Sequence, residues 1–253
     1  MSRRLRLPAL LAAATVLAEV TYPLVHGTTT HLVTVLTVLL FAAASTTHCA
    51  ATRGARAGVT LLVVAAGTGF AAEAVGVQTG VPFGAYRYTA AVGPRLAGVP
   101  LVIPLAWVMM AWPTLVVVRL LLPAAGARLG RALLGGVALA SWDLFLDPQM
   151  VDAGHWTWAA GAGGWPALNG IPLSNAVGWL LVGSLLTALL DRLLPAARVG
   201  PGDDAVPLAL WLWTYASSVL ASLAFFGRPG VALAGGLAMG TVAAPLARRL
   251  LAP

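Results

Sequence analysis

The chain has 253 residues, of which 59% are hydrophobic and only 9% are charged, against roughly 25% charged residues in an average soluble domain. This composition excludes an ordinary soluble domain and indicates an integral membrane protein. The net charge of +7 comes from 15 basic residues, all of them arginines that lie singly or in pairs between apolar runs. Their spacing fits membrane topology better than nucleic-acid binding, and the single cysteine, Cys49, excludes an internal disulfide.

A helix needs about 20 apolar residues to cross a lipid bilayer, and eight stretches of this chain meet that criterion. The first is interpreted as a span and not as a cleaved signal peptide, because no small-residue cleavage site followed by a polar domain comes after it. We therefore expect an all-α polytopic protein forming a single integral domain over residues 1–253, embedded in the lipid of a cell membrane. The predicted spans are 7–25, 29–50, 57–79, 99–122, 129–149, 173–194, 205–226 and 230–250.

The arginines predict the orientation of these spans, since cytoplasmic flanks are enriched in positive charge. Twelve arginines fall on the side of the membrane that holds the N-terminus, and three, Arg87, Arg95 and Arg228, fall on the other side. With an even number of spans, both termini are then predicted to be cytoplasmic.

Carboxylic acids occur inside the predicted spans, where charged groups are costly and mark candidate functional sites. Asp143 and Asp147 lie four residues apart near the end of the fifth span, so both should face the same neighbour. Glu19 and Glu73 lie in the outer halves of spans one and three, which brings the acids toward one depth. The negative ends of the helix dipoles and the loss of water favour their protonated forms.

Two outer loops, at residues 80–88 and 155–165, are rich in aromatic residues and glycine. Such segments lie at the membrane interface or fold back as a lid. They also belong to an internal similarity in which an acid precedes a pair of aromatics by thirteen residues and a Gly-[Val/Ile]-Pro-Leu motif then opens a span. This order predicts two related helical hairpins, spans three to four and five to six, that face each other across a shared site. The two copies are Glu73, Tyr86-Arg-Tyr88 and Gly98-Val-Pro-Leu101, and Asp143, Trp156-Thr-Trp158 and Gly170-Ile-Pro-Leu173.

Buried acids among aromatic side chains suit acid catalysis on an apolar substrate. A protonated acid can donate to an alkene, aromatic rings can stabilise the resulting cation, and a second carboxylate can direct water. The candidate catalytic acids are Asp143, Asp147 and Glu73, although hydrogen bonds between helices would also explain buried acids. Asn175 could bind substrate or water, or cap its helix, and Arg87 could pair with an acid or contact lipid headgroups.

The remaining aromatic residues and the acid pair also allow other interpretations. The simplest interpretation of Trp107, Trp112, Trp179, Trp211 and Trp213 is as packing or interface residues. His155 could shuttle protons but is more simply an interfacial histidine without a role. The Asp143-x-x-x-Asp147 spacing is similar to the Asp-rich motifs with which membrane prenyltransferases hold Mg²⁺. A second such motif is missing, so no metal site is predicted. Buried acids and a two-hairpin repeat would also be natural in a transporter of lipid or protons.

Several motifs between residues 70 and 180 together resemble the membrane carotenoid hydratases of the carotenoid biosynthesis protein family, which act on substrates such as bisanhydrobacterioruberin and gamma-carotene. The motifs are Pro82-Phe-Gly-x-Tyr-x-Tyr88, Gly98-Val-Pro-Leu-x-Ile-Pro-x-x-Trp107, Trp142-Asp-x-x-x-Asp-Pro-x-Met150, Gly154-x-Trp-x-Trp158 and Gly170-Ile-Pro-x-x-Asn-x-x-Gly-Trp179.

The resemblance implies that water is added, without a cofactor, across the terminal double bond of an acyclic carotenoid drawn from the bilayer. A tertiary alcohol would be the product. Under this interpretation the acids transfer protons, and the substrate contacts are Tyr86, Tyr88, Arg87, Trp142, Trp156, Trp158 and Asn175. Ring closure, as in a membrane lycopene cyclase, would begin with the same cation and stays open as an alternative.

Overall fold

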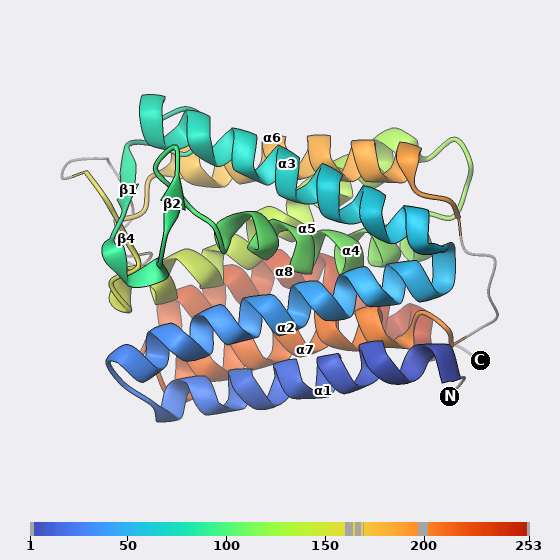
Figure 1. Cartoon of the computed structure of the whole chain (residues 1–253), viewed down its shortest axis with the longest axis horizontal. Coiled ribbons are helices and arrows are strands. Elements are labelled where there is room, and N and C mark those ends of the chain that lie inside the picture. Colours follow the sequence, from blue (N-terminus) through green and yellow to red (C-terminus); the bar gives the residue numbers. More distant parts are fainter. Residues whose placement is uncertain (1–2, 160–163, 165–167, 169, 197–201, 252–253) are drawn as a thin grey trace.

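The structure is a computed structural model that describes residues 3–159, 164, 168, 170–196 and 202–251. Eight long helices in this described part run side by side along the longest dimension of the molecule (Figure 1). Each is long and apolar enough to cross a membrane, which confirms the all-α polytopic fold predicted from the sequence. They are α1 (Arg6–Thr21), α2 (Thr28–Arg53), α3 (Ala55–Thr79), α4 (Ile103–Leu121), α5 (Arg128–Asp152), α6 (Leu173–Leu193), α7 (Ala205–Ala224) and α8 (Pro229–Leu251).

The two ends of the bundle differ in character. The start of α1 and the end of α8 lie together at one end, called here the termini end, and the short strands lie at the other, called the sheet end (Figure 1). Of the twelve arginines predicted to share one side, eleven lie at the termini end, and Arg198 falls outside the described residues. Which end faces the cytoplasm stays a prediction.

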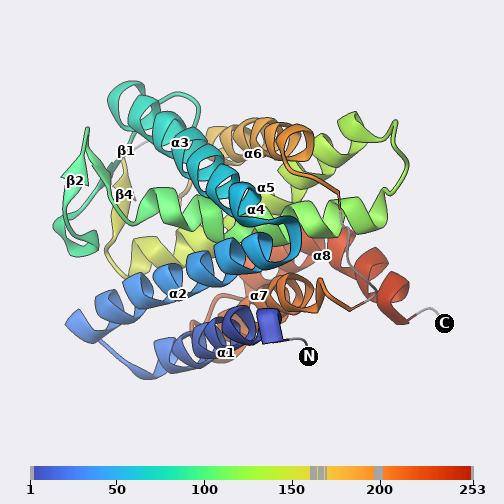
Figure 2. The same ribbon diagram turned by 45° about the vertical axis from the view of Figure 1, so that its right-hand side comes forward.

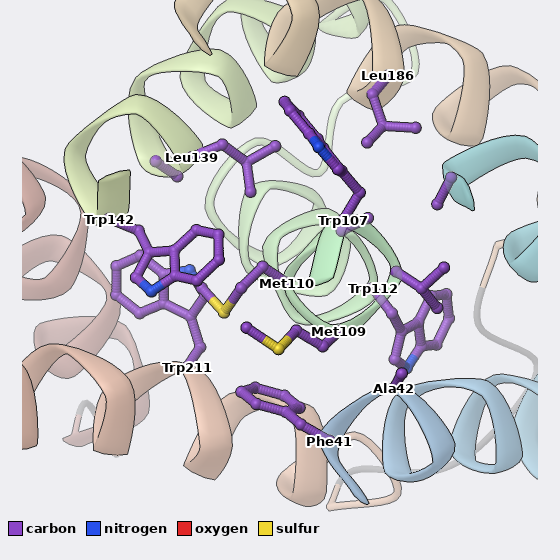
Figure 3. Packing of buried hydrophobic residues seen from close by; sticks show 14 of the residues in the cluster. Phe41, Ala42, Trp107, Met109, Met110, Trp112, Leu139, Trp142, Leu186 and Trp211 are labelled. Atoms are coloured by element: carbon purple, nitrogen blue, oxygen red, sulfur yellow. The ribbon is translucent and has the colours of Figure 1, made fainter. Parts of the chain in front are cut away.

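Helix α4 runs through the middle of the bundle (Figure 2). In the 18-residue apolar stretch of α4, 72% of the residues are buried, compared with 17–56% in the corresponding stretches of the other seven helices. A helix that is apolar on every side can be covered either by lipid or by other helices, and α4 is covered mainly by other helices. Side chains from α2, α5 and α7 pack around it, as Figure 3 shows for Phe41, Leu139, Trp142 and Trp211 against Trp107, Met109, Met110 and Trp112.

Small residues allow α5 and α6 to approach closely. A Cβ atom added at Gly136 would lie 2.6 Å from the carbonyl oxygen of Leu180, and one added at Gly135 would lie 2.2 Å from Thr187 Oγ1. Close backbone approach through small residues is a common way for helices to associate in lipid. It sets the acid-bearing face of α5 directly against the beginning of α6.

The two aromatic loops pair with each other at the sheet end. Strand β1 (Tyr86–Tyr88) is antiparallel to β4 (Trp156–Trp158), with Tyr86 opposite Trp158 and Tyr88 opposite Trp156. Side chains of both strands contact the bundle, since Tyr86 and Tyr88 donate to Glu73 of α3 and Trp156 donates to Asp147 of α5, and their position relative to the membrane surface stays a prediction. The pairing brings the two aromatic motifs of the proposed repeat together, and the repeat itself stays a hypothesis.

One predicted boundary was wrong. Gly98-Val-Pro-Leu101 was expected to open the fourth span, but Val99–Pro100 forms strand β3, which pairs with β2 (Arg95–Leu96). Helix α4 begins only at Ile103. The tight turn with positive φ at Ala97 and Gly98 reverses the chain and makes these residues a hairpin. At the start of α6, by contrast, the helix begins at Leu173 as expected.

Candidate active site

The two acids of α5 face one shared partner, as their spacing predicts. Asn175 Nδ2, at the beginning of α6, donates hydrogen bonds to Asp143 Oδ2 at 2.6 Å and to Asp147 Oδ2 at 2.5 Å. An amide group carries two hydrogens, so one can be assigned to each acid. All three residues are at least 96% buried. The arrangement holds two carboxyl groups side by side away from bulk water.

The remaining oxygens of the two acids differ. Asp147 Oδ1 accepts a hydrogen bond from Trp156 Nε1 at 3.0 Å. Asp143 Oδ1 is buried and has no hydrogen-bond partner in the described part of the chain. Hydrogen bonds from N–H groups stabilise a carboxylate, so Asp147 is the better placed of the two to carry a negative charge. Asp143 is the better placed to hold a proton, on Oδ1.

Glu73 is bound by three donors from two other elements. The hydroxyls of Tyr86 and Tyr88 donate to Oε2, the latter at 2.7 Å, and Trp107 Nε1 donates to Oε1 at 3.2 Å. Burial and, after it, the Glu73 charge raise the pKa of Tyr88 well above its ordinary value, which keeps this phenol protonated as a donor. Strand β1 thus places two hydroxyls over an acid of α3.

An aromatic chamber lies between Glu73 and Asp147. The rings of Trp107 and Trp179 are stacked, with centroids 4.2 Å apart and an angle of 11° between their planes. The chamber encloses about 30 Å³, which is room for roughly two water molecules. Its wall is made by the three donors to Glu73 together with Phe83, Trp156, Trp158, Asn175 and Trp179.

A larger apolar cavity of about 250 Å³ lies on the other side of the same acids. It is bounded by α5, by the beginning of α6 and, across from them, by Ala234 of α8. Leu173 lines it and is 70% exposed at the lipid-facing surface. Asp143 borders this cavity, whereas Asp147 and Asn175 border both the cavity and the aromatic chamber. Asp147 and Asn175 therefore stand between the apolar cavity and the small aromatic chamber, with Asp143 on the cavity side.

The structure separates some predicted site residues from this centre. Arg87 is exposed because it alternates with the two inward-facing tyrosines along β1. Trp142 points into a different cavity, of about 160 Å³, that also contains Glu19. Glu19 accepts a hydrogen bond from Trp213 Nε1 at 2.5 Å. Trp158 does line the chamber and donates to the carbonyl oxygen of Phe83 at 3.2 Å.

Sequence reasoning missed two members of the site. Trp107 and Trp179 were assigned to packing or to the membrane interface, but Trp107 donates to Glu73 and the two rings stack in the chamber wall. A signal for them exists, because each lies nine residues after the glycine of a Gly-[Val/Ile]-Pro-Leu motif, at Gly98 and Gly170.

His155, interpreted from the sequence as an interfacial histidine, lies in the interior of the structure, and a role in proton transfer stays untested. The residue is fully buried beside the site, with Nε2 at 2.8 Å from His31 Nδ1 and Nδ1 at 3.0 Å from Met150 Sδ. Burial and the neighbouring His31 lower the pKa of His155 to about 4, so its ring is neutral at neutral pH.

The fold and the site together define a multi-pass membrane protein with a buried centre of acids and aromatic rings. The chain belongs to the carotenoid biosynthesis protein family, because the profile with that description matches residues 33–245. It is also 35% identical over 138 residues to the bisanhydrobacterioruberin hydratase of Haloarcula japonica. That alignment covers 54% of this chain and 45% of the relative, so the chain spans about half the length of the curated relative it matches. No solved structure matches the chain.

Proposed function

We propose that this protein adds water across the terminal carbon–carbon double bond of an acyclic carotenoid end group, giving a tertiary alcohol without a cofactor. Family membership and the similarity to a hydratase support a reaction on a carotenoid. The observation that carries the proposal is the position of Asp147 between the apolar cavity and the aromatic chamber, with Asp143 beside it on the cavity side. A hydration needs an alkene on one side of the acids and water on the other.

In the proposed first step the alkene lies in the apolar cavity and takes a proton from Asp143. Oδ1 of Asp143 is buried and has no hydrogen-bond partner among the described residues, and the proposal assigns the transferred proton to this oxygen. Transfer to C-2 forms a new C–H bond, uses the π electrons of the double bond and leaves a tertiary cation at C-1. Asp143 becomes a carboxylate, which Asn175 Nδ2 stabilises through Oδ2.

The cation would be stabilised by the aromatic wall and by negative charge. The described residues that line the apolar cavity include no aromatic ring, so the proposal requires C-1 to reach past Asp147 to the aromatic chamber. Ring faces attract cations, more strongly where water is excluded. With three donors directed at it, Glu73 is assigned the role of a fixed carboxylate that balances the cation, and not that of proton donor.

Water held in the aromatic chamber would complete the reaction. Its oxygen bonds to C-1 while Asp147 accepts one of its protons, so the product carries the second proton as its hydroxyl. Asp143 has then lost a proton and Asp147 has gained one. Transfer between the two neighbouring acids restores the starting state, and the net change is the addition of one H₂O to the alkene.

Expression in a host that accumulates an acyclic carotene such as lycopene tests the proposal. Pigment extracts should contain a hydroxylated acyclic end group, identified by mass and by conversion of the hydroxyl to a silyl ether. Asp143→Asn and Asp147→Asn should each abolish this product, because one removes the donated proton and the other removes the base.

Asp152→Asn provides the matched control. It makes the same chemical change on the same helix, at a half-exposed residue paired with Arg228, and should leave the product unchanged. Full activity in both site variants would refute the assignment of the acids. A ring-closed pigment in place of the alcohol would refute hydration while keeping the protonation step.

A further inference from the structure

A second large cavity lies at the termini end, in the opposite half of the molecule from the acids. It encloses about 1200 Å³ where α2, α4, α5, α6, α7 and the end of α8 converge. Part of its wall is apolar and comes mainly from α4 and α7, through Val116, Leu120, Leu208 and Leu212. The rest of the wall is strongly charged. The cavity therefore combines a polar region with an apolar one.

The charged part of the wall is predominantly positive. Five arginines line the cavity together with two aspartates, Asp191 and Asp204, which leaves an excess of positive charge. A cavity lined by one sign of charge between low-dielectric walls concentrates ions of the opposite sign. The arginines are Arg53, Arg119, Arg128, Arg131 and Arg192.

Two of these arginines have a structural task. Arg119 donates to Asp191 and to carbonyl oxygens at the end of α6, including Leu194 O at 2.7 Å. Arg131 donates to Asp191 Oδ2 at 2.9 Å and to the carbonyl oxygens of Leu122 and Ala124. Together they neutralise Asp191 and cap exposed carbonyl groups, so their charge is already used inside the protein.

Arg53 has N–H groups that no acceptor among the described residues binds. Its side chain is 3% exposed and binds Asp204 through Nη2 alone, at 2.7 Å. Its Nε and Nη1 are buried without a hydrogen-bond partner in the described part of the chain. Its guanidinium carbon lies 5.3 Å from the centroid of a ring of Trp112, which holds the group in place. Buried donors without acceptors are rare in proteins and indicate an absent acceptor.

From this combination we propose that the cavity binds an anionic phospholipid, with its phosphate among Arg53, Arg128 and Arg192 and an acyl chain against the apolar wall. Phosphate oxygens are favourable acceptors for guanidinium groups. Clusters of arginine next to membrane-spanning helices attract anionic lipids. The apolar wall favours a lipid over inorganic phosphate as the ligand, because only a lipid has an acyl chain that can contact this wall. This proposal does not depend on the reaction assigned to the acids.

Native mass spectrometry of the purified full chain tests the proposal by titration with dioleoylphosphatidylglycerol and, separately, with dioleoylphosphatidylcholine. The double variant Arg128→Gln/Arg192→Gln removes two charges from the cavity wall. It should bind the anionic lipid roughly ten- to thirtyfold more weakly, as expected for two lost arginine contacts near a membrane surface. The matched control is Arg3→Gln/Arg6→Gln, which removes the same charge from exposed residues at the termini end that do not line the cavity. It should change binding less than about twofold.

Two results would overturn the proposal. Equal weakening in both double variants would show that the lipid responds to general surface charge and not to this cavity. If inorganic phosphate protects the protein against thermal unfolding as well as the anionic lipid does, and displaces that lipid at millimolar concentration, the ligand is a soluble anion. A preference for phosphatidylglycerol that is lost only in the cavity variant supports the proposal.

Discussion

Whether Glu73 is ionised can be tested by removing one of its hydrogen bonds. Tyr88→Phe deletes a hydroxyl that lies 2.7 Å from Glu73 Oε2 and keeps the ring, which packs edge-on against Trp156 with centroids 5.6 Å apart. Hydrogen bonds to a charged group contribute about 1.5–3 kcal/mol, whereas those between neutral groups contribute about 0.5–1.5 kcal/mol. If Glu73 is the carboxylate that balances a cation, the larger range applies. The free energy of unfolding should then fall by about 2 kcal/mol.

The assay is reversible unfolding in mixed micelles for the wild type, Tyr88→Phe, Glu73→Gln and the double variant. Because Glu73→Gln keeps an oxygen acceptor but removes the charge, the four values give the extra stabilisation that a carboxylate charge adds to this hydrogen bond. A coupling below about 0.5 kcal/mol would refute the assignment of Glu73 as a buried carboxylate. Tyr86→Phe provides a parallel cycle, because that hydroxyl donates to the same oxygen.

The other predictions concern packing, acidity and the apolar cavity. Gly136→Ala places a Cβ atom 2.6 Å from the Leu180 carbonyl oxygen and should lower the unfolding free energy by about 1–3 kcal/mol. The control Gly67→Ala, whose Cβ atom meets nothing within 4 Å, should leave the unfolding free energy unchanged or raise it. Equal melting temperatures for the two variants would contradict the close α5–α6 contact. The pKa of His155 is about 4 in the folded protein against 6.5 for the free side chain, so the unfolded chain binds the proton more readily. The contribution of His155 to the unfolding free energy is then full above about pH 6.5 and falls by about 3 kcal/mol as the pH drops toward 4. Melting curves of His155→Gln measured over this pH range should lack that dependence. The same dependence in the variant would show that another group causes it. Ala234→Phe fills the apolar cavity from α8 and should lower product formation at least about tenfold, the size of a lost transition-state contact of 1.4 kcal/mol. Leu233→Phe on the lipid-exposed side of the same helix should not, and full activity of both in the pigment assay would place the substrate elsewhere.

Length and periodicity carried most of the prediction of the fold. Spans could be located because each must supply about 20 apolar residues whatever its packing. The shared partner of Asp143 and Asp147 followed from helical geometry alone, since residues four apart lie on one face. Which residue that partner would be, Asn175, depends on how closely α5 and α6 approach, and this is decided by packing between the helices.

The aromatic loops were harder to interpret. Arg87 could be excluded from the site only once Tyr86–Tyr88 was known to be a strand, because the alternation of side chains then turns it away from both tyrosines. Three residues are too few to show that alternation in a sequence. Trp107 was assigned to packing because a tryptophan within an apolar run has the same pattern whether or not its N–H meets an acid from another helix.

The double hydrogen bond of Asn175 has a stereochemical consequence. By binding Oδ2 of both acids, its amide fixes the orientation of the Asp143 carboxyl group and leaves Oδ1 as the oxygen assigned to proton transfer. Under the proposed reaction, the proton would reach C-2 from one face of a substrate that the cavity walls keep from turning over. Hydration in D₂O should therefore place deuterium at C-2 with a single configuration. The tertiary carbon that receives the hydroxyl carries two methyl groups and would hide this selectivity without the label.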